Sequence, residues 1–264
     1  MMLTPDEFTR YSQQLKLDHI GLEGQLNLKK ASVLCIGAGG LGSSVLLHLA
    51  SAGIGTIGII DNDAVELSNL QRQILYMTSH IGFKKATIAK QQLAALNPSI
   101  DIHAYTERFN INNASELIKQ YDIIADCSDN FATRYLINDV CYYHNKPYVY
   151  AGVHQFKGQC SLFQGQKTPC FRCLYSSIPM QYSVPNCSDG GVLGVLPGLL
   201  GVIQATEIIK WLLTIGHSLA GHLLSIDSLD MQFLTYKIIQ NTECALCVLN
   251  EPLELLTQPA GWRT

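Results

Sequence analysis

The feature that most constrains the fold is a glycine-rich turn placed between an apolar strand and a helix. Residues 32–36 read Ser-Val-Leu-Cys-Ile, and residues 37–42 follow directly as Gly-Ala-Gly-Gly-Leu-Gly. A helical pattern covers 43–52, and a second apolar run, 55–60, ends at Asp61. Glycines let the backbone approach a phosphate, and an acid after the second strand can bind ribose hydroxyls. This order predicts a nucleotide-binding α/β unit.

Apolar strands and helical stretches continue to alternate beyond this unit. The predicted strands of the first half are 32–36, 55–60, 101–105 and 121–125, and the predicted helices are 43–52, 84–96, 114–120 and 133–144. After Pro147 the strands follow one another, and the predicted elements are strands 148–153, 159–163, 223–227 and 232–238 and a long apolar helix, 199–213. We therefore expect an α/β fold: a Rossmann-like, mostly parallel sheet with an antiparallel second half.

The boundary between these two patterns carries no linker, so we expect a single domain over residues 1–264. Its nucleotide-binding half covers about 1–146 and its second half about 147–250. Residues 251–264 contain two prolines and little pattern, which predicts a loosely held tail.

Composition excludes several classes of protein. The formal net charge is −3 and the pI is about 6.2, which gives no basic surface for nucleic acid. The N-terminus lacks the pattern of a signal peptide, and the apolar run 192–203 is too short to span a bilayer. We therefore expect a cytoplasmic protein with no membrane partner. With 47% apolar and only 15% charged residues, we expect it to bury much surface, in part against a second copy.

Four of the nine cysteines form two CxxC pairs, Cys170 with Cys173 and Cys244 with Cys247. Each pair can offer two thiolates to one metal ion, and four thiolates suit the tetrahedral geometry of Zn²⁺. Without a secretory signal, such pairs favour metal binding over disulfides. The two pairs predict a closed structural zinc site that leaves no open position for chemistry.

The remaining cysteines fall into two classes. Four lie in apolar runs and are expected to be small buried side chains, namely Cys35, Cys127, Cys141 and Cys160. Cys187 instead lies in a polar, glycine-containing stretch just before the long helix. An exposed thiol near a helix N-terminus has a lowered pKa and can act as a nucleophile. Cys187 is therefore a catalytic candidate.

Polar residues downstream of the glycine turn distinguish between two kinds of nucleotide. Residues 68–73 read Ser-Asn-Leu-Gln-Arg-Gln, Lys85 follows, and residues 126–130 read Asp-Cys-Ser-Asp-Asn at a predicted strand end. Cationic side chains indicate a bound triphosphate, because its charge must be neutralised during adenylyl transfer. Hydride transfer has little need of such extra cations. Asp129 is placed to bind Mg²⁺, which prefers one or two carboxylates plus phosphate oxygens. An NAD-dependent oxidoreductase is the alternative that the turn and Asp61 alone allow.

Together these motifs resemble the ThiF/MoeB/HesA family, bacterial relatives of ubiquitin-activating (E1) enzymes. The resemblance runs from Arg10 to Cys247 and rests on the glycine turn, the two polar motifs with Arg134, and both CxxC pairs. It implies an adenylyltransferase that uses ATP and Mg²⁺ on the C-terminal glycine of a small ubiquitin-like sulfur carrier protein (MoaD- or ThiS-like, ending in Gly-Gly) and releases pyrophosphate. It also implies a homodimer with a structural zinc, and a place in molybdenum-cofactor or thiamine biosynthesis.

The resemblance assigns a role to each matching residue. The implied catalytic residues are Arg72, Lys85, Asp129 and Cys187, the last matching a family cysteine that joins sulfur transfer in some members. The implied nucleotide-binding residues are Gly37, Gly39, Gly40, Gly42, Asp61, Asp63, Asn69, Arg72, Gln73, Lys85, Asp129 and Asn130, with Asp61 on the ribose and Asp129 on the magnesium. The second half, about 147–250, would bind the carrier and the zinc.

One position near the N-terminus departs from the family pattern. The family usually has Arg-Tyr-(Ser/Asn)-Arg-Gln there, and its second arginine reaches the phosphates bound by the partner subunit. Here that position is Gln13. Loss of such an arginine can lower a rate by several powers of ten. A non-catalytic or weakly active scaffold is therefore a second alternative, although the other site residues favour an active enzyme.

Overall fold

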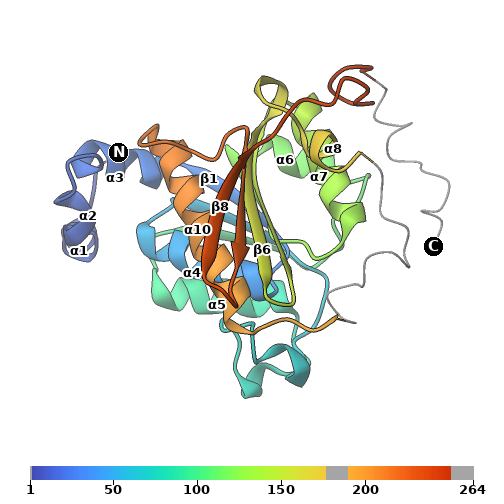
Figure 1. The fold of residues 1–264 in the computed structure, drawn as a ribbon. Helices are drawn as coiled ribbons and strands as arrows, with labels where there is room; N and C mark the ends of the chain where they lie inside the picture. The colour runs from blue at the N-terminus through green and yellow to red at the C-terminus, as the bar shows by residue number, and fades with distance from the viewer. Residues whose placement is uncertain (1, 177–189, 251–264) are drawn as a thin grey trace.

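A single twisted sheet runs through the centre of the computed structural model, which describes residues 2–176 and 190–250 (Figure 1). The sheet has eight strands in the order β3-β2-β1-β4-β5-β6-β7-β8. The strands are β1 (Ser32–Ile36), β2 (Thr56–Ile60), β3 (Asp101–Tyr105), β4 (Ile123–Asp126), β5 (Pro147–His154), β6 (Lys157–Gln164), β7 (His222–Asp227) and β8 (Gln232–Lys237). Neighbours from β3 through β5 are parallel, whereas β5 to β8 are antiparallel. The expected parallel-then-antiparallel sheet is confirmed.

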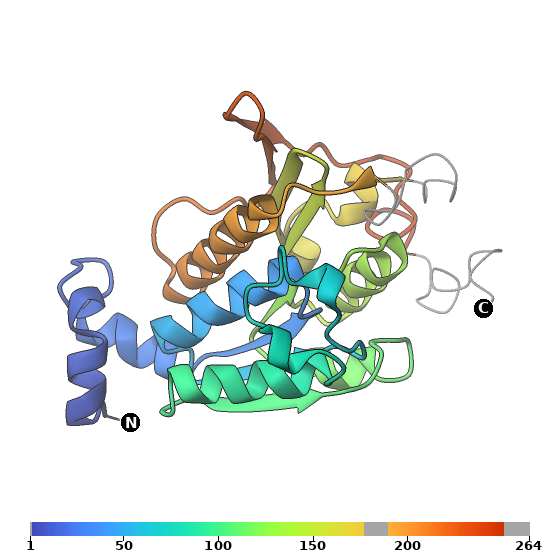
Figure 2. The same ribbon diagram turned by 90° about the horizontal axis from the view of Figure 1, so that it is seen from below.

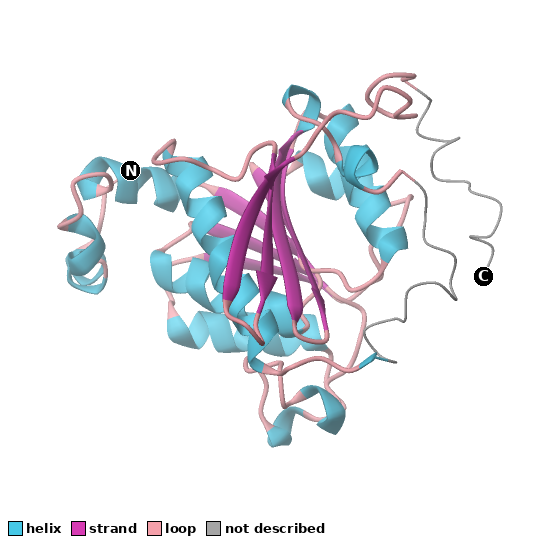
Figure 3. Ribbon diagram, viewed as in Figure 1, coloured by secondary structure: helices cyan, strands magenta, loops and turns pink. Residues whose placement is uncertain are grey.

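Helices cover both faces of this sheet (Figures 2 and 3). The helices are α1 (Pro5–Arg10), α2 (Ser12–Leu15), α3 (Gly21–Lys30), α4 (Gly40–Ala52), α5 (Lys85–Leu96), α6 (Ala114–Lys119), α7 (Phe131–Tyr143), α8 (Phe171–Leu174) and α10 (Val195–Leu213). Helices α4, α5 and α10 pack on one face, and α6, α7 and α8 pack on the other. The short helices α1 and α2 extend to one side of the molecule.

Alternation along the parallel strands produces these two cores. In β1, Val33 and Cys35 point into the core under α4 and α10, whereas Leu34 and Ile36 point into the core under α7. All four side chains are buried, because helices cover both faces of a parallel sheet. The apolar run 32–36 therefore reads as a strand buried on both faces, as predicted.

Helix ends differ from the sequence prediction in two informative places. Helix α4 begins at Gly40 rather than at residue 43, because the glycine turn itself supplies the first helical turn. Helix α10 begins at Val195 rather than at residue 199, since a proline is tolerated in the first turn of a helix. Helix α1 begins at Pro5, where the Thr4 hydroxyl accepts a hydrogen bond from the N–H of Glu7.

Helix α10 is long and apolar enough to cross a membrane by length and composition alone. In this fold it packs along α4 and against β5 and β6, and Leu200, Ala205 and Ile208 lie in the core. Burial against the sheet thus accounts for part of its apolar character, while Val195 and Val202 stay exposed.

Candidate functional site

A cavity of about 430 Å³ opens where the carboxyl ends of β1, β2 and β4 meet. The chain leaves β1 toward β2 on one side and returns through β4 on the other, which makes this the point where the strand order reverses. Ligands of open α/β sheets bind at such a crevice. The predicted residues that line the cavity are Gly37, Gly39, Gly40, Asp61, Asp63, Arg72, Gln73, Lys85, Asp129 and Asn130.

Glycine is required at two positions of the turn, because a side chain there would clash with neighbouring backbone atoms. Gly37 has φ of 94°, and a Cβ there would lie 2.7 Å from the carbonyl oxygen of Cys127. A Cβ at Gly42 would lie 2.2 Å from the carbonyl oxygen of Gly37. Gly42 therefore lets the turn close on itself and does not line the cavity. The first turn of α4, which begins at Gly40, presents its free N–H groups at the cavity.

Asp61 braces the turn from the end of β2. One carboxylate oxygen accepts a hydrogen bond from the N–H of Ala38 at 2.7 Å, and the other accepts from the N–H of Asp63 at 2.8 Å. Burial raises the pKa of Asp61, while these two hydrogen bonds act in the opposite direction. The carboxylate lies on the cavity wall after the second strand, which is a position where an acid can bind ribose hydroxyls.

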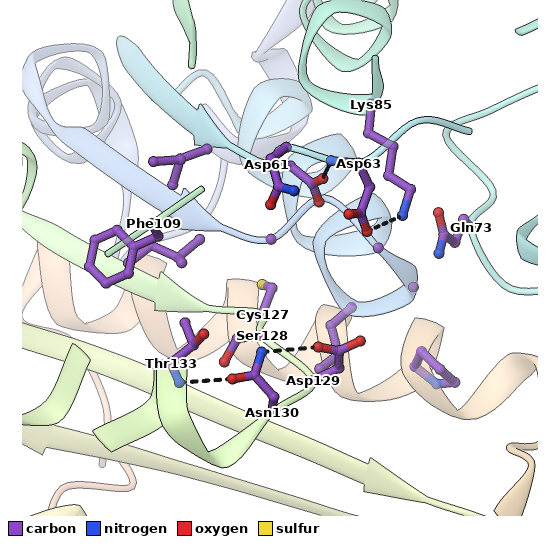
Figure 4. A pocket seen from close by; sticks show the side chains of 18 of the residues that line it. Asp61, Asp63, Gln73, Lys85, Phe109, Cys127, Ser128, Asp129, Asn130 and Thr133 are labelled. Carbon is purple, nitrogen blue, oxygen red and sulfur yellow. Dashed lines mark hydrogen bonds and ion pairs between the residues drawn. The ribbon is translucent and has the colours of Figure 1, made fainter. Parts of the chain in front are cut away.

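Cationic side chains line a second wall of the cavity, where Lys85 reaches Asp63 (Figure 4). Lys85 begins α5, is only 5% exposed, and pairs with Asp63 at 3.1 Å between Nζ and Oδ2. The Arg72 guanidinium lines the same cavity and donates to the carbonyl of Ser68 at 3.1 Å. Gln73 is buried beside them, and its Oε1 has no hydrogen-bond partner among the described residues. A buried amide oxygen without a partner is costly, so this wall fits a polar ligand.

The third wall is formed by the start of α7. The side chain of Asn130 caps this helix by accepting a hydrogen bond from the N–H of Thr133 at 2.9 Å. Its amide donates to Asp129 at 3.3 Å, and the exposed Asp129 carboxylate faces the cavity. A carboxylate oxygen at this edge is a donor that fits a hard divalent cation such as Mg²⁺.

Two predicted site residues, and the position of Gln13 where the family usually has arginine, lie away from the cavity or outside the described residues. Asn69 does not line the cavity; it is buried in the loop before Arg72, and its side-chain oxygen accepts from the N–H of Glu66 at 3.3 Å. Its effect on the cavity is to shape this loop. Gln13 is exposed on α2, outside the set of cavity-lining residues. Cys187 lies outside the described residues.

Several cavity residues were not among the predicted ones. Arg108 and Phe109 follow β3, and Thr133 lies in the first turn of α7. Only their position in the chain could have indicated them, because each lies in the segment that follows the carboxyl end of a parallel strand. Phe109 is buried and lines the cavity with Ile36, which adds an apolar wall beside the polar ones.

A second site lies at the far end of α7. The sulfur atoms of Cys170, Cys173, Cys244 and Cys247 all lie within 4.8 Å of one another. The sulfur–sulfur separations are 4.0 Å for Cys170 to Cys173, 3.6 Å for Cys170 to Cys244 and 3.3 Å for Cys173 to Cys247. Four sulfurs about 2.3 Å from a central zinc would be about 3.8 Å apart. The geometry therefore fits the predicted tetrahedral metal site.

The loop that carries the first CxxC pair is fixed to α7. Arg172 makes two hydrogen bonds to the buried Asp139 carboxylate, at 2.7 and 2.6 Å, and its guanidinium lies 4.7 Å from the Tyr135 ring centre. The N–H of Phe171 donates to Asn138 at 2.8 Å. This loop is thus held in place by the fold on one side of the cluster.

The predicted buried thiols are confirmed. Cys35, Cys127, Cys141 and Cys160 are all buried in the two main cores.

Comparison with known proteins shows the family of this chain. Residues 11–246 match the ThiF family. The chain belongs to this family. It is 44% identical over 252 residues to a sulfur carrier protein adenylyltransferase of Thermus thermophilus, covering 94% of this chain and 93% of that protein. It is 47% identical to a probable molybdopterin-synthase adenylyltransferase of Porphyra purpurea, covering 89% of this chain but 62% of that protein.

Solved structures share the fold. A crystal structure of E. coli MccB with ATP matches with a TM-score of 0.76 and 25% identity, covering 90% of this chain and 73% of the other. The resemblance to the ThiF/MoeB/HesA family is therefore confirmed. The names of these relatives favour adenylyl transfer over hydride transfer, and so over the oxidoreductase alternative.

Proposed function

We propose that this ThiF-family chain adenylates the C-terminal glycine of a small ubiquitin-like sulfur carrier protein and releases pyrophosphate. The observation that carries the proposal is the cavity that gathers Arg72, Lys85 and Asp129 around the glycine turn. The 44% identity to a sulfur carrier protein adenylyltransferase over nearly the whole chain supports the choice of substrate. The pathway would be molybdenum-cofactor or thiamine biosynthesis.

The reaction asks for positioning and positive charge rather than for a protein base. The carrier's terminal carboxylate is itself the nucleophile: it bonds to the α-phosphorus of ATP as the bond to the bridging oxygen breaks, and pyrophosphate carries away that electron pair. Arg72 and Lys85 stabilise the charge on the phosphates, and the N-terminus of α4 supplies N–H donors. Asp129 would hold the Mg²⁺ that shields the phosphate charge.

The remaining cavity residues hold the nucleotide in place. In this proposal Asp61 binds the ribose, while Gly37, Gly39 and Gly40 allow the phosphates to approach the backbone. The further nucleotide-binding residues are Gly42, Asp63, Asn69, Gln73 and Asn130, of which Gly42 and Asn69 act by shaping the turn and the loop.

Lys85 is held ready for this role by Asp63. Their 3.1 Å contact keeps a nearly buried ammonium paired in the free protein. A triphosphate in the cavity would offer Lys85 a stronger anionic partner, which leaves the more exposed Asp63 to solvent or to the nucleotide's sugar.

The second half of the chain is assigned the other binding functions. We infer a single adenylation domain, with nucleotide bound by residues 1–146 and the carrier bound by residues 147–250. Cys170, Cys173, Cys244 and Cys247 would hold a Zn²⁺ whose role is structural, because four thiolates leave no open coordination position. The proposed working form is a cytoplasmic homodimer, and Cys187 is a candidate for attack on the acyl adenylate during sulfur transfer.

Carrier-dependent exchange of radiolabelled pyrophosphate into ATP tests the proposal. We expect exchange with a carrier that ends in Gly-Gly, and none with the same carrier lacking its last glycine. ATP binding without exchange on any Gly-Gly carrier of the same genome would contradict the substrate assignment. Binding of NADH without binding of ATP would contradict the reaction class.

A further inference from the structure

Two buried thiols lie directly beneath the glycine turn. Cys35 is in β1, two residues before Gly37, and Cys127 follows the end of β4, two residues before Asp129. Their sulfur atoms are 3.6 Å apart. Cys35 is 0% exposed and Cys127 is 6% exposed. The proposed adenylation chemistry uses neither thiol.

Strand register places the two thiols on the same face of the sheet. Ile36 pairs with Asp126 across the parallel strands β1 and β4, so Cys35 and Cys127 are diagonal neighbours. The N–H of Cys127 donates to the carbonyl of Ile36 at 3.0 Å, which holds the two strand ends together. The proximity is therefore built into the sheet.

The Cys35 thiol contacts the glycine turn, and Cys127 is itself a cavity residue. The Cys35 thiol donates to the carbonyl of Gly37 at 3.3 Å. The Cys127 thiol donates to Oε1 of Gln204 on α10 at 3.5 Å, and Cys127 itself lines the cavity (Figure 4). Cys127 is thus the member of the pair that a small molecule in the cavity would approach.

We propose that Cys35 and Cys127 form an oxidation site whose disulfide prevents nucleotide binding. The oxidant is a hydroperoxide. The Cys127 sulfur, on losing its proton, attacks one peroxide oxygen; the O–O bond breaks and a sulfenic acid forms. The Cys35 sulfur then displaces hydroxide from that sulfenic acid, which completes the disulfide. With hydrogen peroxide, two thiols and one peroxide give one disulfide and two molecules of water.

Disulfide formation must move the backbone around the glycine turn. A disulfide is about 2.05 Å long, so the sulfurs must approach by about 1.5 Å. The backbone of Cys127 is in close contact with the turn, because a Cβ at Gly37 would lie 2.7 Å from the carbonyl oxygen of Cys127. The displacement therefore passes to the turn and to Asp129. This inference rests on the proposed binding of nucleotide at that turn.

Bound nucleotide and oxidation should exclude each other. ATP in the cavity covers Cys127 and holds the turn in its present position. Both thiols are buried, so oxidation is slower than at an exposed cysteine. We expect the reaction to need excess peroxide over a long incubation.

The test uses the full-length, zinc-loaded, reduced protein. The affinity for a non-hydrolysable ATP analogue is measured first, then after hydrogen peroxide treatment and blocking of free thiols. We expect a disulfide-linked peptide pair containing Cys35 and Cys127 by mass spectrometry, and a fall in affinity of about tenfold or more, equivalent to the loss of a charge-assisted phosphate contact. Dithiothreitol should restore affinity, and analogue present during oxidation should lower the yield of the linked pair.

Matched variants separate this pair from the other thiols. Cys35→Val should keep nucleotide affinity after peroxide, whereas Cys160→Val, at another buried cysteine of the same core, should lose it as the parent does. Absence of the linked peptide pair in the oxidised parent would overturn the proposal, and so would a linked pair with unchanged affinity. If Cys35→Val does not fold, peptide mapping of the parent still decides. Failure of the reduced parent to bind the analogue would instead count against the proposed function.

Discussion

The two halves of this molecule build their sites by different means. In the parallel half, the ends of β1, β2 and β4 meet at one edge of the sheet, and the cavity residues follow from that topology. In the antiparallel half, the four-cysteine site joins Cys170 and Cys173 to a segment beyond the last strand. Hydrogen-bonded strands position the first site, whereas at the second site α7 fixes the loop of Cys170 and Cys173, and a bound metal would join the other CxxC pair to it.

Burial shows the same contrast. Four of the five residues in β1 are buried, and all four residues of β4 are buried. All six residues of β8 are exposed, and this strand leads into the loop that carries Cys244 and Cys247. We therefore expect the second half to depend on its metal, and the first half to depend on its core.

The largest expected effect comes from opening the four-cysteine site. Cys244→Ser should lower the free energy of unfolding by about 4 kcal/mol, roughly a third of the ~12 kcal/mol typical of a structural zinc site. Thermal unfolding and bound zinc per chain measure it. Glu243→Ser, at the exposed neighbouring position, is the control and should change neither. Unchanged stability after loss of zinc would show that packing alone holds the second half.

The next effect concerns the cationic wall of the first half. Lys85→Ala should lower the rate of pyrophosphate exchange by about 100- to 1,000-fold, because a preorganised charge on the phosphates is lost. Lys84→Ala is a close control, since Lys84 is exposed and its Nζ donates to the carbonyl of Asn62 at 2.6 Å. That control should change the rate by less than about twofold. Equal effects of the two variants would remove Lys85 from the site.

A smaller effect is expected at Asp126, where the two halves meet. Burial raises its pKa from 3.8 to about 6, although Arg134 and Ser128 act against the shift. The folded state therefore binds more protons than the unfolded state between about pH 4 and pH 6. Stability present below pH 4 is lost as the pH rises through 6, by about 3 kcal/mol in total. Unfolding free energies from pH 3.5 to 7 should show this slope in the parent.

The variant Asp126→Asn separates this group from the rest of the chain. It cannot titrate, so the part of the slope between pH 4 and pH 6 that belongs to Asp126 should disappear. A slope equal to that of the parent would assign the proton uptake to other groups.

The smallest effect is expected at Gln13. Its side chain is exposed on α2, and the cavity already contains cations from Arg72, Lys85, Arg108 and Arg134. Gln13→Arg should therefore change the exchange rate by less than about threefold, a difference of well under 1 kcal/mol. A gain of several powers of ten would instead identify the natural protein as the weakly active scaffold.

The sequence predicted most of the first half because period and turn chemistry agree there. The strand over 32–36 and the strand over 101–105 match the structure at both ends. Helix α3 over Gly21–Lys30 was not predicted. It buries only three of its ten residues, so its apolar pattern is weak, and it contains glycines at 21 and 24. Its stability comes from tertiary packing, which local propensity does not report.

The candidate site was predictable where a sequence motif is typical of one kind of binding or catalysis. The glycine turn, Lys85, Asp129 and the two CxxC pairs are such motifs. Arg108 and Phe109 carry no motif, and only the ordering of strands in the sheet brings them to the cavity. Asn69 shows the reverse case, since its side chain turns into its own loop.

Helix α7 gives the molecule a mechanical link between its two sites. Asn130 and Thr133 at its start border the nucleotide cavity, while Asn138 and Asp139 further along hold the first CxxC loop. Its 13 residues form a rod of about 20 Å. If ligand binding at one site moves α7, the geometry of the other site changes as well. Such thermodynamic coupling between two sites is reciprocal. Metal binding and nucleotide binding should therefore change each other's affinity by the same factor.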